Sequence, residues 1–309
     1  MNFLPRIISI WGKGGVGKST IASALSLYLA SNDFKVLLLT TDFVPTISKI
    51  FNVKAASASP VCVQRNLWIS EFSPEDVIEL WKERFGDEVY EVVSSILPVD
   101  KKIIDYIAGA PGLSDEFMLY VVYEILRNED YDFVIWDLPA AGDALRLLKI
   151  ELQFYNHLGD AVKMYLKLKG FIGKIKRKTK SSPLNLINEW RRLAENIFSM
   201  LSSKEHVAYV ISTPEVLSFE VTKRIISTLD EFNITTGGII VNMLLPNNLV
   251  NYRIIEDKLK LQKRILGELN KLSHTKNVSL ITIPYLTIDL SNYLNLYELK
   301  NYFLSLHII

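Results

Sequence analysis

The stretch from Ile7 to Thr20 reads IISIWGKGGVGKST. A mostly apolar run predicts a buried strand, a glycine-rich turn follows, and the apolar segment 21–29 predicts a helix directly after the turn. The residues that fit the pattern G-x-x-x-x-G-K-[ST] are Gly12, Gly17, Lys18 and Ser19. Because this pattern lies between a strand and a helix, it predicts a phosphate-binding loop rather than a chance glycine-rich turn.

The residue types in this loop suit an anion. Glycines allow the backbone to bend and to bring its N–H groups close to phosphate oxygens. The helix that begins near Lys18 directs its positive end at the same place. We expect Lys18 to neutralise the β- and γ-phosphates and the Ser19 hydroxyl to coordinate Mg²⁺. The predicted nucleotide-binding residues here are Gly12, Lys13, Gly14, Gly15, Val16, Gly17, Lys18, Ser19 and Thr20.

Size and composition indicate a globular protein. The chain has 309 residues, of which 49% are hydrophobic and 22% charged, and its net charge is +1. This charge gives no general attraction to nucleic acid or to an acidic membrane. No apolar run reaches the length of about 20 residues that spans a bilayer. A single cysteine, Cys62, excludes an internal disulfide framework. We expect a cytoplasmic protein without a signal peptide.

Further apolar runs alternate with amphipathic segments. The expected strands lie at 35–42, 131–137, 207–211, 238–242 and 278–284. This alternation predicts an α/β fold: a mostly parallel sheet with helices on both faces. Asp42 and Asp137 end two of the runs, at the edge where such sheets bind ligands. Asp137, downstream of the loop, is therefore expected to hold Mg²⁺ through water; the alternative is an aspartate that only caps the next segment.

The segments at about 73–127 and 151–204 resemble helical insertions. Their apolar residues recur at helical spacing, for example Val77, Trp81 and Phe85. We expect them to form a helical subdomain within a single ATPase domain that covers residues 1–309. The alternative is that these faces simply pack on the sheet. A basic tract at 163–180 is either a solvated linker or a contact for acidic partners.

Together, these elements resemble the arsenite-pump and tail-anchored-protein-targeting ATPase family, whose P-loop class is related to MinD and ParA. The string KGGVGKS at 13–19 is similar to the deviant Walker A motif of that class. Four further stretches resemble, in order, switch I, a P-G-x-x-E stretch, switch II and a V-N-x-L-L segment; they are 41–48, 111–116, 137–148 and 241–245. The similarity runs over nearly the whole chain and implies a P-loop NTPase fold.

The resemblance implies a role for individual residues. Asp42 falls on the catalytic aspartate that orients the attacking water, and Lys13 on the lysine that reaches the partner's nucleotide across a homodimer. Lys18 completes the catalytic set. Asn242 falls on an adenine-binding asparagine, and Pro284 and Tyr285 follow the final strand, where a second adenine contact is expected. ATP or ADP and Mg²⁺ are the implied ligands.

This chain also departs from the family pattern. Residues 43–46 replace the usual Pro-Ala-His-Ser/Asn of switch I, and Asp143 replaces a histidine of switch II. The zinc-binding C-x-x-C pair of many targeting members is missing, so no zinc is expected.

Three functions remain open. The first is a carrier that binds the hydrophobic transmembrane helices of tail-anchored proteins and delivers them to a membrane, with a membrane receptor as a further partner. The second is a positioning or partition ATPase of the MinD/ParA type. The third is arsenite extrusion, which Cys62 alone disfavours because trivalent arsenic prefers several thiolates. No specific nucleic-acid partner is expected.

Overall fold

A computed structural model describes most of the chain. The described residues are 6–44, 46–53, 59–96, 98–110, 113–127, 131–149, 152, 183–246, 253–290 and 292–304. They form two compact units, which are described separately below. The first unit comprises Met1–Phe72, Glu129–Leu145 and Leu201–Ile309, and the second comprises Ser73–Asn128 and Arg146–Met200.

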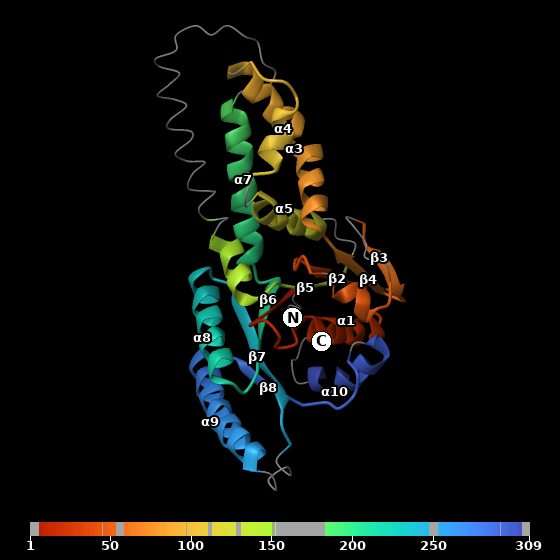
Figure 1. The fold of residues 1–309 in the computed structure, drawn as a ribbon, viewed down its shortest axis with the longest axis vertical. Coiled ribbons are helices and arrows are strands. Elements are labelled where there is room, and N and C mark those ends of the chain that lie inside the picture. The colour runs from red at the N-terminus through yellow and green to blue at the C-terminus, as the bar shows by residue number, and fades with distance from the viewer. Residues whose placement is uncertain are drawn as a thin grey trace. The chain divides into compact units, whose positions relative to one another are not determined.

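The first unit is built on one eight-stranded sheet of order β3-β4-β2-β5-β1-β6-β7-β8 (Figure 1). Its strands are β1 (Ile7–Gly12), β2 (Val36–Thr40), β3 (Val61–Gln64), β4 (Leu67–Glu71), β5 (Phe133–Asp137), β6 (His206–Ser212), β7 (Thr235–Leu244) and β8 (Ser279–Pro284). All neighbours pair in parallel except the edge pair β3–β4, which is antiparallel. The predicted α/β architecture is thus confirmed.

Helices cover both faces of this sheet. On one face lies α1 (Lys18–Ser31), which contacts β1, β2 and β5 and is itself covered by η2 (Tyr293–Leu299) and α10 (Lys300–Phe303). Because α1 is covered on both sides, every residue from Ile21 to Ala30 is buried, the small polar Ser23 and Ser26 included. On the other face lie α8 (Val216–Glu231) and α9 (Arg253–Lys276), which contact β6, β7 and β8. The C-terminal residues Leu296, Leu299 and Phe303 are buried in the core with α1.

Two local features differ from the sequence-based expectation. Asp42 does not end a strand: β2 stops at Thr40, and the chain turns because the Asp42 N–H donates to the Thr40 hydroxyl. The β3–β4 hairpin was not predicted. Its turn contains Asn66 in the left-handed conformation at φ 64°, which an asparagine tolerates better than most residues. A short helix α2 (Ile47–Ile50) precedes this hairpin.

The second unit is helical in the part that the structure describes. It contains α3 (Pro74–Ile96), α4 (Ile103–Ala108), α5 (Leu113–Arg127) and most of α7 (Pro183–Leu201). The start of α3 is a capping box: Ser73 accepts from the Asp76 N–H and Asp76 accepts from the Ser73 N–H, with Pro74 at the first helical position. Phe85 on α3 packs against Phe117 and Trp190, so this unit has an aromatic core of its own.

Several expectations fall outside the described residues. These are most of the helix expected from 151, the basic tract at 163–180, and Pro111 and Gly112 of the P-G-x-x-E stretch. Within the described ranges, no helix is both long enough and apolar enough to cross a membrane.

Candidate functional site: a phosphate loop with a buried carboxylate

The backbone of the loop between β1 and α1 requires its glycines. Gly15 and Gly17 have φ of 81° and 95°, values that L side chains rarely adopt. A Cβ added at Gly12 would lie 2.6 Å from the Ile211 carbonyl oxygen of the neighbouring strand β6. A Cβ at Gly17 would lie 2.6 Å from Asn242 Nδ2. The motif is therefore dictated by backbone conformation and by close packing against β6 and β7.

Lys18, the first residue of α1, is almost fully buried. Its ammonium donates to the carbonyl oxygen of Lys13 over 3.5 Å, which keeps it within the loop. Burial lowers the pKa of Lys18, and the carboxylates of Asp137 and Asp42 oppose this effect. One buried ammonium thus lies close to two carboxylates: Asp137 at the end of β5, and Asp42 in the turn that follows β2. Lys13 itself is half-buried in the turn.

Asp137 is the most unusual group in this region. It ends β5, pairs with Ile10 of β1 and Thr40 of β2, and is fully buried. Among the described residues, neither carboxylate oxygen has a hydrogen-bond partner of normal geometry. Burial raises the pKa of Asp137 to about 7, although the nearby Ser19 hydroxyl and Lys18 ammonium favour its ionised form.

A buried carboxylate without partners is costly unless something else occupies its acceptor positions. A hydrated Mg²⁺ fits here, because it prefers oxygen ligands and usually keeps several waters. The residues present, Asp137 with the Ser19 hydroxyl beside it, therefore suit the metal that the sequence implied. Bound there, Mg²⁺ would neutralise charge on phosphate oxygens.

Asp42 lies in the turn after β2 and is half-buried. One of its carboxylate oxygens accepts a hydrogen bond from the Val44 N–H over 3.1 Å, which forms an Asx turn. The same carboxylate is close enough to Lys18 and Asp137 to influence the pKa of both. The structure therefore brings Asp42, Asp137 and Lys18 together, as expected from the carboxyl ends of adjacent parallel strands.

The residues expected near adenine line one cavity of about 200 Å³. Its wall includes Gly17, Thr20, Asn242, Pro284 and Tyr285. Asn242 donates from Nδ2 to the Val16 carbonyl over 3.0 Å, so its side chain connects β7 to the phosphate loop. This cavity is therefore continuous with the loop that would hold the phosphates.

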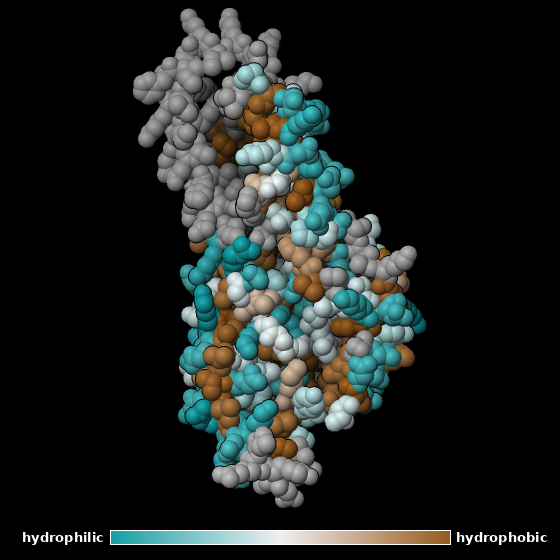
Figure 2. Space-filling view, viewed as in Figure 1, coloured by the Kyte–Doolittle hydropathy of each residue, from teal (hydrophilic) through white to brown (hydrophobic). Residues whose placement is uncertain are grey.

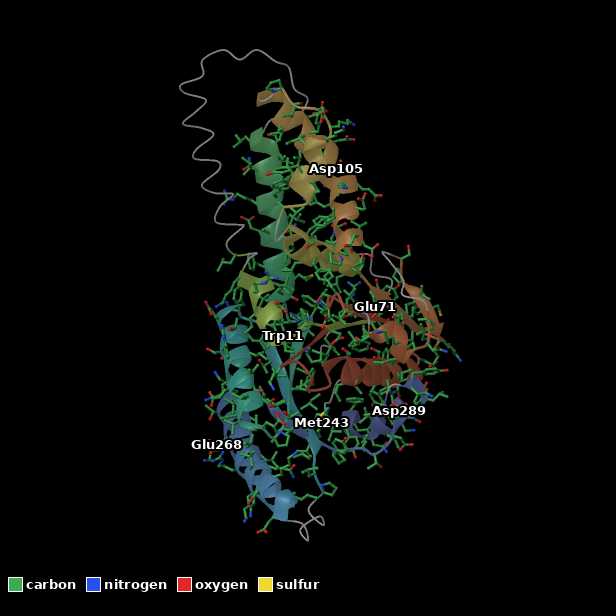
Figure 3. The ribbon with its side chains drawn as sticks, viewed as in Figure 1. Trp11, Glu71, Asp105, Met243, Glu268 and Asp289 are labelled. Carbon is green, nitrogen blue, oxygen red and sulfur yellow. The ribbon has the colours of Figure 1, made fainter. Side chains whose placement is uncertain are left out.

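Sequence reasoning missed two residues here: Met243, which lines this cavity, and Gln262, which lines only the neighbouring one. Met243 has φ of 61°, is 36% exposed, and lines both this cavity and a neighbouring one of about 260 Å³ (labelled in Figure 3). Gln262 of α9 forms a reciprocal pair with the backbone of Leu245, at 2.8 and 2.9 Å, and so fixes the chain after β7. Neither residue carries a sequence signal, because each acts through a contact distant along the chain.

Glu71 was also missed. This buried carboxylate at the end of β4 accepts hydrogen bonds from backbone N–H groups of residues 46–48. By contrast, Asp143 is exposed, in the helical segment 141–149 that follows β5.

A glycine-dependent phosphate loop, a buried lysine and a buried strand-end aspartate at one edge of a parallel sheet define the P-loop nucleoside triphosphatase class. Residues 5–304 match the family described as Anion-transporting ATPase, and the chain belongs to that family. It is an ATPase.

Individual relatives carry two kinds of name. A protein of Aquifex aeolicus, provisionally named arsenical pump-driving ATPase 2, is 27% identical over 96% of this chain and 98% of its own length. ATPase GET3 of Komagataella phaffii is 24% identical, over 96% of this chain and 89% of its own. ATPase get3 of Pyrenophora tritici-repentis is 26% identical over 88% and 84%. The family resemblance inferred from the sequence is confirmed.

Proposed function

We propose that this chain is a homodimeric targeting ATPase that binds hydrophobic transmembrane segments of tail-anchored proteins and delivers them to a membrane. The observation that carries the proposal is that the chain contains two compact units. The first unit carries the phosphate loop and is called the nucleotide-binding unit below; the second consists of helices in the part that the structure describes and is called the helical unit. A P-loop ATPase needs no such unit for hydrolysis, whereas a carrier needs helices that can form a groove for an apolar helix. Relatives named GET3, which match along most of their length, support this choice.

Much of the apolar surface in the helical unit is used internally. Val77, Trp81 and Phe85 of α3 are each less than 5% exposed, so these side chains belong to the core and are not available to a client. Client binding would instead use side chains that are only half-buried, such as Val93 of α3 and Ile107 of α4. Figure 2 has apolar surface, in brown, in the region of α3 and α4.

The nucleotide chemistry follows from the chain's own residues. The loop amides and Lys18 would bind the phosphates, and Ser19, together with Asp137 acting through water, would hold Mg²⁺, which supplies charge neutralisation when bound. Asp42 orients the attacking water, and the hydrogen bond from the Val44 N–H to one of its oxygens holds the carboxylate in the turn. In this proposal Lys13 contacts the nucleotide of the partner subunit.

A second copy is needed because one chain carries one phosphate loop. Large apolar side chains are exposed on segments that follow the carboxyl ends of different strands: Val44 at 62%, Leu217 at 67% and Tyr285 at 55%. They follow β2, β6 and β8, at the edge that carries the loop. A surface of this kind supports pairing with a second copy across the nucleotide.

The test is capture of a client. The Asp42→Asn variant is co-expressed with a protein that bears a C-terminal transmembrane helix, and we expect a soluble complex that depends on ATP. Ile107→Asp should reduce the yield of complex while leaving the ATPase rate unchanged. Leu294→Asp, at a 58% exposed apolar residue of η2, serves as the matched control and should affect neither. ATP-dependent dimers that leave the helix to aggregate would contradict the carrier function.

Arsenite extrusion is the second candidate, because two relatives carry arsenical-pump names. Cys62, the chain's single cysteine, is exposed and donates from its thiol to the Gln64 carbonyl over 3.2 Å. Two copies provide two thiols, fewer than a three-thiolate site needs. Stimulation of ATP hydrolysis by arsenite would favour this candidate.

A membrane-positioning role of the MinD type is disfavoured because the C-terminal Leu296, Leu299 and Phe303 are buried rather than presented to lipid.

A further inference from the structure

Glu71 makes contacts that nucleotide binding, as derived above, does not explain. Its carboxylate is 5% exposed at the end of β4 (labelled in Figure 3). Oε1 accepts from the Thr46 N–H at 3.1 Å and from the Ile47 N–H at 2.8 Å, and Oε2 accepts from the Ser48 N–H at 3.2 Å. One buried side chain thus holds three consecutive backbone amides of the switch I segment.

This arrangement determines where α2 begins. A four-residue helix makes few hydrogen bonds of its own and is not stable without tertiary contacts. Its first N–H groups need acceptors from elsewhere, and a carboxylate is the strongest acceptor available to them. Ile47 and Ser48 are buried beside Glu71, so the amides are fixed in a site that water does not reach freely.

Fixing the backbone of Thr46 also places its side chain. The Thr46 hydroxyl lies 3.5 Å from the Ser19 hydroxyl, across 27 residues of sequence. Neighbouring oxygen ligands of an octahedral Mg²⁺, each about 2.1 Å from the metal, lie about 3 Å apart. Two hydroxyls at the observed separation can therefore face the same hydrated ion, next to the unpartnered oxygens of Asp137.

We propose that Thr46 contributes its hydroxyl to the magnesium side of the nucleotide site, and that Glu71 is the positioning residue that holds Thr46 there. This inference rests on the proposed nucleotide mechanism and deepens it.

The test measures nucleotide affinity with and without metal, using a fluorescent non-hydrolysable ATP analogue and the full-length protein. In the wild type, Mg²⁺ should strengthen binding relative to EDTA. In Thr46→Val and in Glu71→Gln we expect this magnesium-dependent gain to fall about tenfold or more. In EDTA all three proteins should bind the analogue equally. Thr46→Ser, which keeps the hydroxyl, should behave as the wild type.

The double variant should lose no more than the more affected single variant, because both changes remove the same contact. Glu268→Gln, on the exposed surface of α9, controls for loss of a carboxylate and should change nothing. If Glu71→Gln fails to fold, the comparison of Thr46→Val with Thr46→Ser still decides the role of Thr46.

An unchanged magnesium-dependent gain in Thr46→Val would overturn the inference, as would equal losses with and without Mg²⁺ in Glu71→Gln. Either result could occur in a protein that still hydrolyses ATP and captures clients, so the proposed function would stand. A wild type without magnesium-dependent ATP hydrolysis would remove the proposed mechanism and this inference together.

Discussion

We expect the buried His206 to make the free energy of unfolding of the first unit depend on pH. The imidazole is fully buried at the start of β6. Its Nδ1 lies 2.7 Å from the Leu201 carbonyl oxygen, and its Nε2 lies 2.7 Å from the Ser9 hydroxyl. Because a carbonyl only accepts, Nδ1 carries the proton and Nε2 accepts from Ser9. The Ser9 hydroxyl in turn accepts from Trp11 Nε1 over 2.7 Å, so every member is satisfied with a neutral histidine.

Burial lowers the pKa of His206 from about 6.5 to about 4. The unfolded chain therefore binds a proton at His206 at a higher pH than the folded protein does. As a result, the contribution of His206 to the free energy of unfolding is greatest above pH 6.5 and is lost as the pH falls towards 4. A pKa shift of this size corresponds to a total change of about 3 kcal/mol in the free energy of unfolding. Between pH 7 and pH 5 the contribution of His206 should fall by about 2 kcal/mol.

The assay is urea denaturation at pH 7 and pH 5, comparing the wild type with His206→Gln. Glutamine places an acceptor near Ser9 but does not titrate, so the variant should be less stable at pH 7 and should lose about 2 kcal/mol less on acidification. His274→Gln, at an exposed position of α9, is the control and should retain the wild-type pH dependence. The reasoning is refuted if the free energy of unfolding of His206→Gln changes between pH 7 and pH 5 as much as that of the wild type. It is also refuted if NMR shows His206 of the wild type titrating near pH 6.5.

Four further outcomes are expected. Asp42→Asn should bind ATP normally but lower kcat by about a hundredfold or more, because only the water-orienting carboxylate is lost; normal turnover in a rapid-quench assay would exclude that role. Gly17→Ala should weaken ATP binding by about tenfold or more, since its φ of 95° and the 2.6 Å approach of Asn242 leave no room for a methyl group. Gly267→Ala, in open space on α9, should instead stabilise the fold by about 0.5–1 kcal/mol. Phe85→Ala should destabilise the helical unit by about 3–5 kcal/mol in denaturation experiments, and an unchanged transition would show that its aromatic contacts contribute little.

The order of strands could be predicted only in part. Parallel strands buried on both faces, such as β1, β2 and β5, are recognised from continuous apolar runs. The β3–β4 hairpin was missed because β3 is exposed at the sheet edge and has no such run. The order of the strands along the chain also does not predict their order in the sheet. For example, β5 lies between β1 and β2 in the sheet, although more than ninety residues separate it from β2 along the chain.

The phosphate loop could be recognised from the sequence without the structure. Its chemistry depends on φ angles and on a lysine at a fixed offset, within a single strand-turn-helix unit, so local sequence carries the whole signal. Asp42 and Asp137 could also be nominated, since both follow apolar runs at the ligand-binding edge. The family comparison then agreed with the fold that these motifs implied.

Only the tertiary structure shows which groups lie together on the proposed magnesium side of the site. Whether Asp137 finds partners for its oxygens depends on side chains from β2, α1 and the switch segment, and sequence spacing does not fix those distances. Glu71 is an ordinary glutamate in the sequence, and it acquires a role only because β4 pairs with β2 and brings its carboxylate beneath the amides of Thr46, Ile47 and Ser48. Contacts of this kind depend on packing between elements remote along the chain, which no local pattern encodes.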